Sequence, residues 1–343
     1  MKLKLASLIG AVALLVSSPV SAKGTLNIFT YGNTTSPEMI ERFEKTYDIK
    51  VTITDFDTAD TALAKVRAGG HDFDIVTIPA DYVPVWIKEG LLLETRPDQM
   101  ESFKNVDPSA IGVYFDPGRH YTAPWLWGTL GMIVNTDIYK GDPNTSAIFL
   151  DPPKELIGKI VVVPEMTDVM RLAIRYMGGQ QCTDDKKILR AVRDKLMEAK
   201  PKWLGIEYTT IEKFAAGDYA GGTNWNGESL RVRLQAPHFV YGYPKEGYSM
   251  WMDSVAVLAD AKNVENAKLY QKFVMEPENA ALASNFARYA NWIVGSEKFM
   301  DSKMAGAPEV YIPKEHRANA MIAQACPPEV NKIYTQIWTE LNK

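Results

Sequence analysis

The sequence has no excess of positive charge. Its 343 residues include 38 Lys and Arg and 42 Asp and Glu, which gives a formal net charge of −4. A protein that binds nucleic acid needs a basic face to neutralise phosphates, whereas the basic residues here are scattered among acids. We therefore expect no nucleic-acid partner. The acidic balance is compatible with a cationic ligand.

The sequence also lacks the motifs of common enzymes. It contains no G-x-S-x-G, no H-E-x-x-H and no glycine-rich phosphate loop. Neither cysteine has a histidine close to it in sequence. No metal-ligand spacing relates the four histidines to one another or to a cysteine: His71, His120, His238 and His316. We therefore expect a protein that is not an enzyme and that uses no metal and no cofactor.

Long apolar runs are absent except at the N-terminus. There, Lys2 and Lys4 precede an apolar segment over residues 5–16, and a Val20-Ser21-Ala22 sequence follows that is typical of a cleavage site. A membrane-spanning helix needs about 20 apolar residues, so the run is short for an uncleaved anchor. The pattern predicts a signal peptide over residues 1–22, cleaved after Ala22, and an exported, soluble mature chain.

Cysteine is scarce, since only Cys182 and Cys326 occur. An oxidising compartment outside the cytoplasm lets two such residues pair, although two free thiols are the alternative. A bond that closes so long a loop would stabilise the fold by roughly 4 to 5 kcal/mol in the chain-entropy model. We expect the disulfide.

The rest of the chain alternates between strand and helix patterns, and its length suffices for two domains. In the first part the alternation predicts a parallel sheet with helices on both faces and ligand loops at residues 31–36 and 79–82. A stretch rich in proline, glycine and aromatic residues, 114–131, leads to a second lobe near Asn135. The expected strands are 25–30, 50–54, 73–78, 132–135, 160–163, 219–224 and 252–258, and the expected helices are 38–47, 58–67, 167–177, 186–199, 209–216, 227–235, 264–275, 277–286 and 329–341.

Two segments, residues 225–228 and 244–263, combine aromatic and acidic side chains with an apolar run that predicts a buried strand. Carboxylates hold ammonium groups and aromatic faces attract cations, so these segments predict half of a cleft for an organic cation. Each residue has a structural alternative. Glu228 could favour a helix dipole, Asp253 could form an internal salt bridge, and the aromatic side chains could be core residues.

Several segments together resemble one family, the periplasmic spermidine/putrescine-binding proteins of ABC transporters, which are bacterial extracellular solute-binding proteins. The resemblance covers nearly all of the mature chain. It is carried by Tyr47 to Val51, Phe73 to Val76, Pro124 with Trp127, Trp225 with Gly227 and Glu228, Pro244 to Gly247 with Asp253, and Tyr289 to Asn291.

The resemblance implies an α/β fold of the type II periplasmic-binding-protein class, with two lobes that have central mixed sheets and are joined by a hinge. It implies lobe 1 over residues 23–134 plus 250–305 and lobe 2 over residues 135–249 plus 306–343. A monomer in the periplasm would close over a polyamine, such as putrescine or spermidine, and deliver it to an ABC permease in the inner membrane.

The resemblance also implies the ligand-binding residues. Glu228 and Asp253 match acids that hold amine groups. Trp225, Trp251 and Tyr289 match an aromatic box, and Glu165 with Asp168 match a second acidic pair. The remaining implied contacts are Asp81 and Tyr82 in one loop of the first lobe, Tyr31 and Asn33 in another, and Glu329 near a distal amine.

The first loop departs from the family pattern. Asn33 stands where an acid is usual, Thr34 replaces a tyrosine, and Pro79 replaces a serine. One rival hypothesis is therefore that the same fold binds an amino acid, an opine or another amine with a carboxylate, which Arg288 or Arg231 would hold. A second rival is that the closed form is presented to a membrane sensor.

Overall fold

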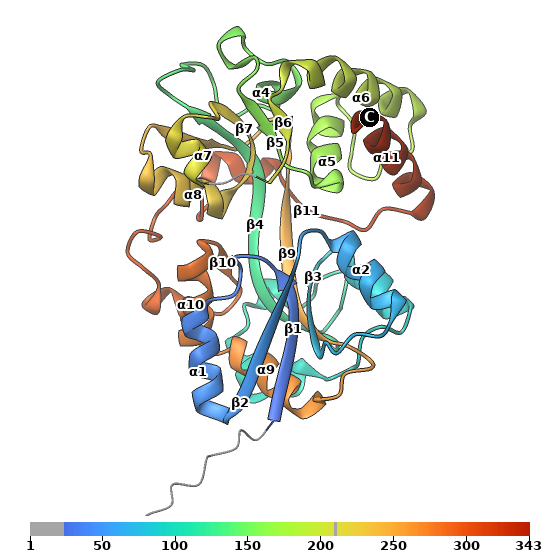
Figure 1. Cartoon of the computed structure of the whole chain (residues 1–343), viewed down its shortest axis with the longest axis vertical. Helices are drawn as coiled ribbons and strands as arrows, with labels where there is room; N and C mark the ends of the chain where they lie inside the picture. Colours follow the sequence, from blue (N-terminus) through green and yellow to red (C-terminus); the bar gives the residue numbers. More distant parts are fainter. Residues whose placement is uncertain (1–23, 209–210) are drawn as a thin grey trace, which may run out of the picture.

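The computed structural model describes residues 24–208 and 211–343. The predicted signal peptide and its cleavage site lie outside the described residues, as does the start of the helix predicted at 209–216. Two lobes stand one above the other in Figure 1, and two long strands, β4 (Thr122–Asn135) and β9 (Tyr248–Val257), run through both. Figure 1 also shows helices around the sheet strands of each lobe.

The first lobe has a mixed sheet. Its strands follow the order β2 (Ile49–Phe56), β1 (Gly24–Tyr31), β3 (Ile75–Pro79), β9 and β4. β1 pairs in parallel with both of its neighbours, but β9 pairs antiparallel with β3 and β4. The parallel sheet predicted for the first part of the chain is confirmed for its three strands. The chain returns from the second lobe along β9 in the opposite direction, so the whole sheet is mixed, as the resemblance implied.

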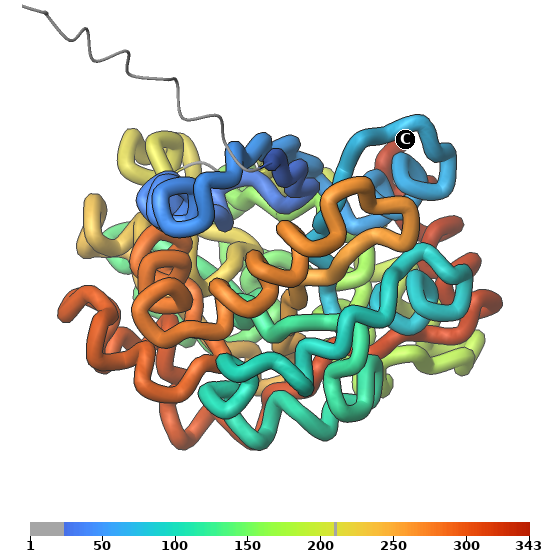
Figure 2. Tube along the Cα trace, turned by 90° about the horizontal axis from the view of Figure 1, so that it is seen from below, coloured from blue at the N-terminus to red at the C-terminus, as the bar shows by residue number. Residues whose placement is uncertain are grey.

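Local signals set the helix starts of the first lobe as predicted. Ser36 caps α1 (Pro37–Tyr47) by accepting a hydrogen bond from the Met39 amide at 3.3 Å, and Pro37 takes the first helical position. The other helices of this lobe are α2 (Ala59–Ala68), α3 (Val83–Lys88), α9 (Val264–Val274) and α10 (Pro277–Ala287). Figure 2, seen from below, shows α1 beside α10, and Arg42 pairs there with Glu278 at 2.5 Å.

The second lobe is also built on a mixed sheet. β5 (Ile160–Val162) pairs in parallel with β6 (Gly205–Ile206) and β7 (Gly221–Trp225), whereas β4 is antiparallel to β7 and to β8 (Phe239–Gly242). Its helices are α4 (Ala147–Leu150), α5 (Met166–Tyr176), α6 (Lys186–Ala199), α7 (Ile211–Ala216), α8 (Asn226–Gln235) and α11 (Pro328–Leu341). Short elements complete the chain: β10 (Ala290–Asn291), β11 (Ala320–Ile322), and 3₁₀ turns at Pro97–Gln99, Glu101–Asn105, Pro108–Ala110, Lys154–Leu156, Lys200–Lys202, Ser296–Phe299 and Lys314–Asn319.

β4 begins ten residues before the strand expected at 132–135, within the stretch rich in proline and aromatics. A proline removes a ladder donor and is normally confined to edges or bulges of a sheet. The pairing of β4 with β9 shifts register between Pro124 and Trp127, and this irregularity accommodates the proline. A single strand therefore serves both lobes.

Each lobe has its own apolar core. In the first lobe the cores draw on residues between 26 and 126 and between 252 and 293, and in the second lobe the largest core draws on residues between 130 and 250 and between 312 and 341. We propose lobe boundaries at 134/135, 249/250 and 305/306; the core of the second lobe begins at Leu130, a few residues before the first of them. Cys182 and Cys326 form the predicted disulfide. In the part of the chain that the structure describes, no helix is both long and apolar enough to cross a bilayer.

Candidate functional site: an acidic cleft between the lobes

A cavity of about 400 Å³ is lined by residues of both lobes. All of the predicted ligand contacts except Glu329 lie along its wall: Tyr31, Asn33, Asp81, Tyr82, Glu165, Asp168, Trp225, Glu228, Trp251, Asp253 and Tyr289. The wall also includes Gly32, Thr34 and Pro79, which belong to the predicted ligand loops. It further includes residues that the sequence did not predict as part of the site: Phe56, Asp57, Ala59, Thr167, Arg171 and Tyr208.

Strand ends bring these residues together. Tyr31 ends β1, Asp81 follows β3, and Trp225 ends β7, so parallel strands of both lobes direct their carboxyl ends at the cavity. Glu165 and Asp168 follow β5 at the start of α5. Residues that are far apart in sequence are close in space here, because these strand ends meet where the two lobes face each other.

Flat aromatic rings form much of the wall. Trp251 and Tyr289 pack edge to face with ring centroids 4.8 Å apart, and Tyr208 stacks on Trp225 at 6.0 Å. The indole N–H of Trp251 is buried and has no acceptor among residues 24–208 and 211–343. Such rings offer an apolar surface for methylene groups and π faces for cations.

Apart from the exposed Asp57, two carboxylates of the cleft have no hydrogen-bond or salt-bridge partner in the described part of the chain, namely Glu165 and Asp253. Burial, and then the negative charge of Asp168, raises the pKa of Glu165 well above its ordinary value. Burial likewise raises the pKa of Asp253, with Asp81 and Asp168 adding to the shift. A cation that entered the cleft would relieve both effects.

Glu228 occupies the first turn of α8, so the alternative of a favourable helix-dipole interaction is compatible with its position. The same side chain also lines the cavity. Asp253, by contrast, lacks the internal salt bridge considered for it, because no arginine or lysine within the described ranges lies within ion-pair distance.

Asn33 has a backbone reason to replace the usual acid. Its φ of 60° lies in the left-handed region, which asparagine tolerates better than most residues. The side chain is exposed at the edge of the cavity. Thr34 turns back toward its own loop, where its hydroxyl donates to the Tyr31 carbonyl at 2.7 Å.

Arg171 is the basic residue among the cleft residues that were not predicted from the sequence. It is 3% exposed and pairs with Asp81 at 2.5 Å and with Asp168 at 3.2 Å. Burial alone would lower the pKa of the guanidinium, but the charges of Asp81 and Asp168 together raise it. One signal was available, since Asp168 and Arg171 are three residues apart and share a helix face.

Three predicted contacts lie elsewhere. Glu329 is exposed in the first turn of α11, and this turn does not border the cavity. Arg288 pairs with Asp301 at 2.8 Å, and neither it nor Arg231 lines the cavity. The arginine available to a ligand carboxylate is therefore Arg171. No group of side chains within the described ranges is arranged to hold a metal ion.

Two α/β lobes on shared strands, with an acidic aromatic cleft between them, define a type II periplasmic binding protein. The chain belongs to the bacterial extracellular solute-binding protein family, whose model matches residues 38–297. It is accordingly a solute-binding protein and not an enzyme, as the lack of catalytic motifs predicted.

Several similar proteins are named as polyamine-binding or polyamine-transport proteins. A putrescine/agmatine-binding protein of Pseudomonas aeruginosa is 24% identical over 99% of this chain and 97% of its own length. A spermidine/putrescine-binding periplasmic protein of Escherichia coli is 27% identical over 88% of this chain and 87% of its own. A solved structure described as a spermidine/putrescine ABC transporter from Listeria monocytogenes has a TM-score of 0.87 at 26% identity and covers 93% of this chain and 98% of that one.

Proposed function

We propose that this protein is the periplasmic substrate-binding component of an ABC transporter and that it captures a polyamine, such as putrescine or spermidine, by closure of its lobes. The observation that carries the proposal is a cleft with six carboxylates, one guanidinium and several aromatic rings along its wall. A polyamine is an apolar chain with positive ends, and this wall is complementary to it in charge and in shape.

The energetics suffice for such a ligand. Each charge-assisted hydrogen bond between an ammonium and a carboxylate contributes about 1.5 to 3 kcal/mol, and an ammonium over an indole face contributes about 0.5 to 2 kcal/mol. Micromolar affinity requires about 8 kcal/mol in total. Two amine ends and a desolvated chain reach that value. The names of the relatives support a periplasmic location and a permease partner.

A second candidate is an amine that carries a carboxylate, such as an amino acid or an opine. Arg171 favours it, because its Nε is buried and has no acceptor among the residues that the structure describes. A ligand carboxylate could accept from that nitrogen. The other two nitrogens of the guanidinium, Nη1 and Nη2, already pair with Asp168 and Asp81. Because these protein carboxylates take the place of a ligand carboxylate, the polyamine is the favoured ligand. With either ligand, the closed form could be presented to a membrane sensor instead of to an ABC permease.

Calorimetry tests the function directly. The mature protein is unfolded and refolded to remove any bound ligand, and it is then titrated with putrescine, spermidine, spermine, agmatine, arginine and γ-aminobutyrate. Heat with at least one polyamine is expected. No heat with any polyamine would refute the proposal, and heat with γ-aminobutyrate or arginine alone would favour the second candidate.

Replacing Glu228 by Gln separates the two structural interpretations of that residue. If the carboxylate holds an amine, the substitution weakens polyamine binding by at least tenfold, because it removes one charge-assisted contact. The fold should tolerate the change, since Glu228 is partly exposed and a charge near a helix end typically contributes about 0.3 to 1 kcal/mol. Unchanged affinity with slightly reduced stability would leave Glu228 with its helix-dipole role only.

A further inference from the structure

Arg171 is a fixed cation inside the cleft. Its Nη2 donates to Asp81 at 2.5 Å and its Nη1 donates to Asp168 at 3.2 Å. The side chains of all three residues are less than 10% exposed. Charge-assisted hydrogen bonds are strongest where water is excluded, so the guanidinium binds both carboxylates and compensates one of their two negative charges.

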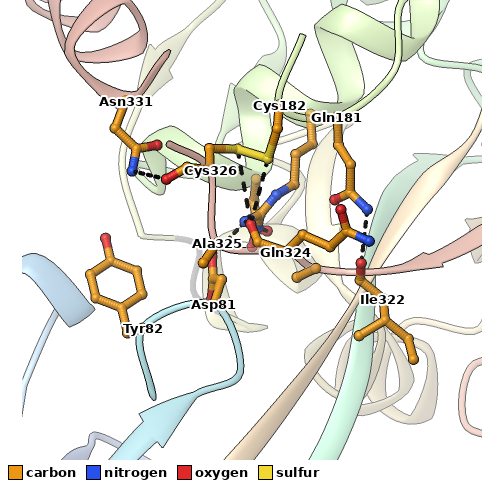
Figure 3. Close-up of polar contacts among 12 residues, drawn as sticks. Asp81, Tyr82, Gln181, Cys182, Ile322, Gln324, Ala325, Cys326 and Asn331 are labelled. Carbon is orange, nitrogen blue, oxygen red and sulfur yellow. Dashed lines mark hydrogen bonds and ion pairs between the residues drawn. A yellow bond between two sulfur atoms is a disulfide. The ribbon is translucent and has the colours of Figure 1, made fainter. Parts of the chain in front are cut away.

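Residues 320–326 form a segment that holds the guanidinium of Arg171 in position. The Gln324 carbonyl accepts a hydrogen bond from Arg171 Nη2 at 3.1 Å, and the Gln181 amide donates to the Ile322 carbonyl at 2.9 Å. Figure 3 shows the disulfide of Cys182 and Cys326 directly beside Gln324. Arg171 would have to give up its contacts to a covalently anchored segment in order to leave the cleft.

The ion pair also joins the two lobes. Asp81 belongs to the loop after β3 in the first lobe, and Arg171 belongs to α5 in the second. Tyr208 makes a second connection of this kind, since its hydroxyl donates to the carbonyl of Asp57. The contact between Asp81 and Arg171 is therefore available only when the lobes are close together.

This pairing divides the acids of the cleft into two groups. Asp81 and Asp168 are held by Arg171, and a ligand ammonium that approached them would meet a positive guanidinium. The other four acids that line the cavity do not pair with Arg171: Asp57, Glu165, Glu228 and Asp253. A short diamine can use the second group alone. A triamine has a third charge and a longer chain, and its extra ammonium reaches toward the occupied acids.

We propose that Arg171 is a specificity-determining residue: it stands in for one ammonium group of a longer polyamine and thereby favours diamines over triamines. The inference rests on the proposed polyamine-binding function. It assigns Asp81 and Asp168 to the protein's own cation, so these two acids do not contact the ligand in the wild-type complex.

The experiment compares Arg171→Gln with the wild type by calorimetry with putrescine, cadaverine, spermidine and γ-aminobutyrate. The wild type should bind the diamines more tightly than spermidine. In Arg171→Gln, the ratio of spermidine affinity to putrescine affinity should rise at least tenfold, because Asp81 and Asp168 become available. An unchanged ratio would overturn the proposal. Binding of γ-aminobutyrate to the wild type that disappears in the variant would also overturn it, because Arg171 would then be a carboxylate receptor.

Two further variants control for general damage. Arg175→Gln changes an arginine one turn further along α5 that lies outside the cleft and donates to the Glu246 carbonyl, and its affinity ratio should equal that of the wild type. Arg171→Lys keeps the positive charge and should keep the preference for diamines even where Arg171→Gln folds poorly. A lysine variant that prefers spermidine as strongly as a neutral variant would refute the role of the charge.

A readout without ligand separates this inference from the proposed function. Small-angle scattering of the ligand-free protein should show a larger radius of gyration for Arg171→Gln than for the wild type, because the ion pair between the lobes is lost. If no polyamine binds to the wild type, the proposed function fails and scattering decides whether Arg171 bridges the lobes. Identical scattering curves would then refute that role as well.

Discussion

Asp253 should affect stability and binding in opposite directions. Its carboxylate is 7% exposed, lies on β9 opposite Pro79, and has no hydrogen-bond or salt-bridge partner among residues 24–208 and 211–343. A buried charge without a partner is unfavourable for the ligand-free protein. The same charge is what an ammonium would need. Asp253→Asn should therefore stabilise the empty protein at neutral pH and weaken the complex.

The sign of the pH dependence follows from the raised pKa of Asp253. In the unfolded chain an aspartate loses its proton near pH 3.9, whereas the native carboxyl keeps it to higher pH. Between these two values the native state binds more protons than the unfolded state, so the free energy of unfolding falls as pH rises. At a pH above the native pKa, each unit by which the native pKa exceeds the unfolded-state pKa lowers the free energy of unfolding by about 1.4 kcal/mol. Asparagine does not titrate and removes this loss.

The assay is denaturant unfolding of ligand-free wild type and Asp253→Asn at pH 5 and pH 8. The gain in unfolding free energy of the variant should be larger at pH 8 than at pH 5, because the free energy of unfolding of the wild type falls as pH rises above the pKa of the unfolded chain. In calorimetry with the preferred polyamine, the variant should bind about 10-fold to 150-fold more weakly, which corresponds to the loss of about 1.5 to 3 kcal/mol.

Asp218→Asn is the matched control, because Asp218 is exposed in the second lobe and does not line the cleft. Its stability and its affinity should equal those of the wild type at both pH values. The reasoning would be refuted if Asp253→Asn destabilised the empty protein at pH 8, or if it bound polyamine as tightly as the wild type.

Two further predictions concern the acids of the cleft and the disulfide. Since Glu165 and Asp253 have raised pKa values in the empty cleft, they must release protons to pair with ammonium groups, so affinity should increase from pH 5.5 to pH 7.5. Calorimetry in two buffers of different ionisation enthalpy should detect this proton release, and equal heats in both would contradict it. Removing the disulfide in a Cys182→Ser, Cys326→Ser double variant should lower the free energy of unfolding by about 2 to 5 kcal/mol, measured against wild type with and without reductant, because the bond closes a loop between residues 144 apart. Equal stability of the double variant and the wild type would show that the unfolded chain gains little conformational entropy when the disulfide is removed.

Features that depend on neighbours in sequence were predictable here. The cap at Ser36 uses an amide three residues away, and α6 starts where Asp185 accepts from the amides of Lys187 and Ile188. The residues of the site were predicted from the resemblance; several of them end or follow a strand or start a helix, whereas Trp251 and Asp253 lie within β9. Their convergence in one cavity came from the resemblance and from the rule that ligands bind at the carboxyl ends of parallel strands.

Features that depend on distant partners were not predictable. The full length of β4 requires β9 as a partner, because the proline-rich part of β4 has no strand pattern of its own. The direction of β9 depends on the path of the chain through the second lobe. Likewise, Arg171 looked like an ordinary helix residue until Asp81, 90 residues away in sequence, came within 2.5 Å of it.

The distribution of charge in the cleft connects these observations to the choice of ligand. If all six lining carboxylates were unpaired, the empty closed form would concentrate negative charge in a buried volume of about 400 Å³. Arg171 binds Asp81 and Asp168 and compensates one negative charge, whereas Glu165 and Asp253 have no partner among the described residues. The empty cleft therefore retains an electrostatic cost that a doubly charged ligand removes, and this difference favours closure around the ligand over closure without it. A ligand with one charge would leave part of the cost in place, and a third charge would compete with a cation that the protein already supplies.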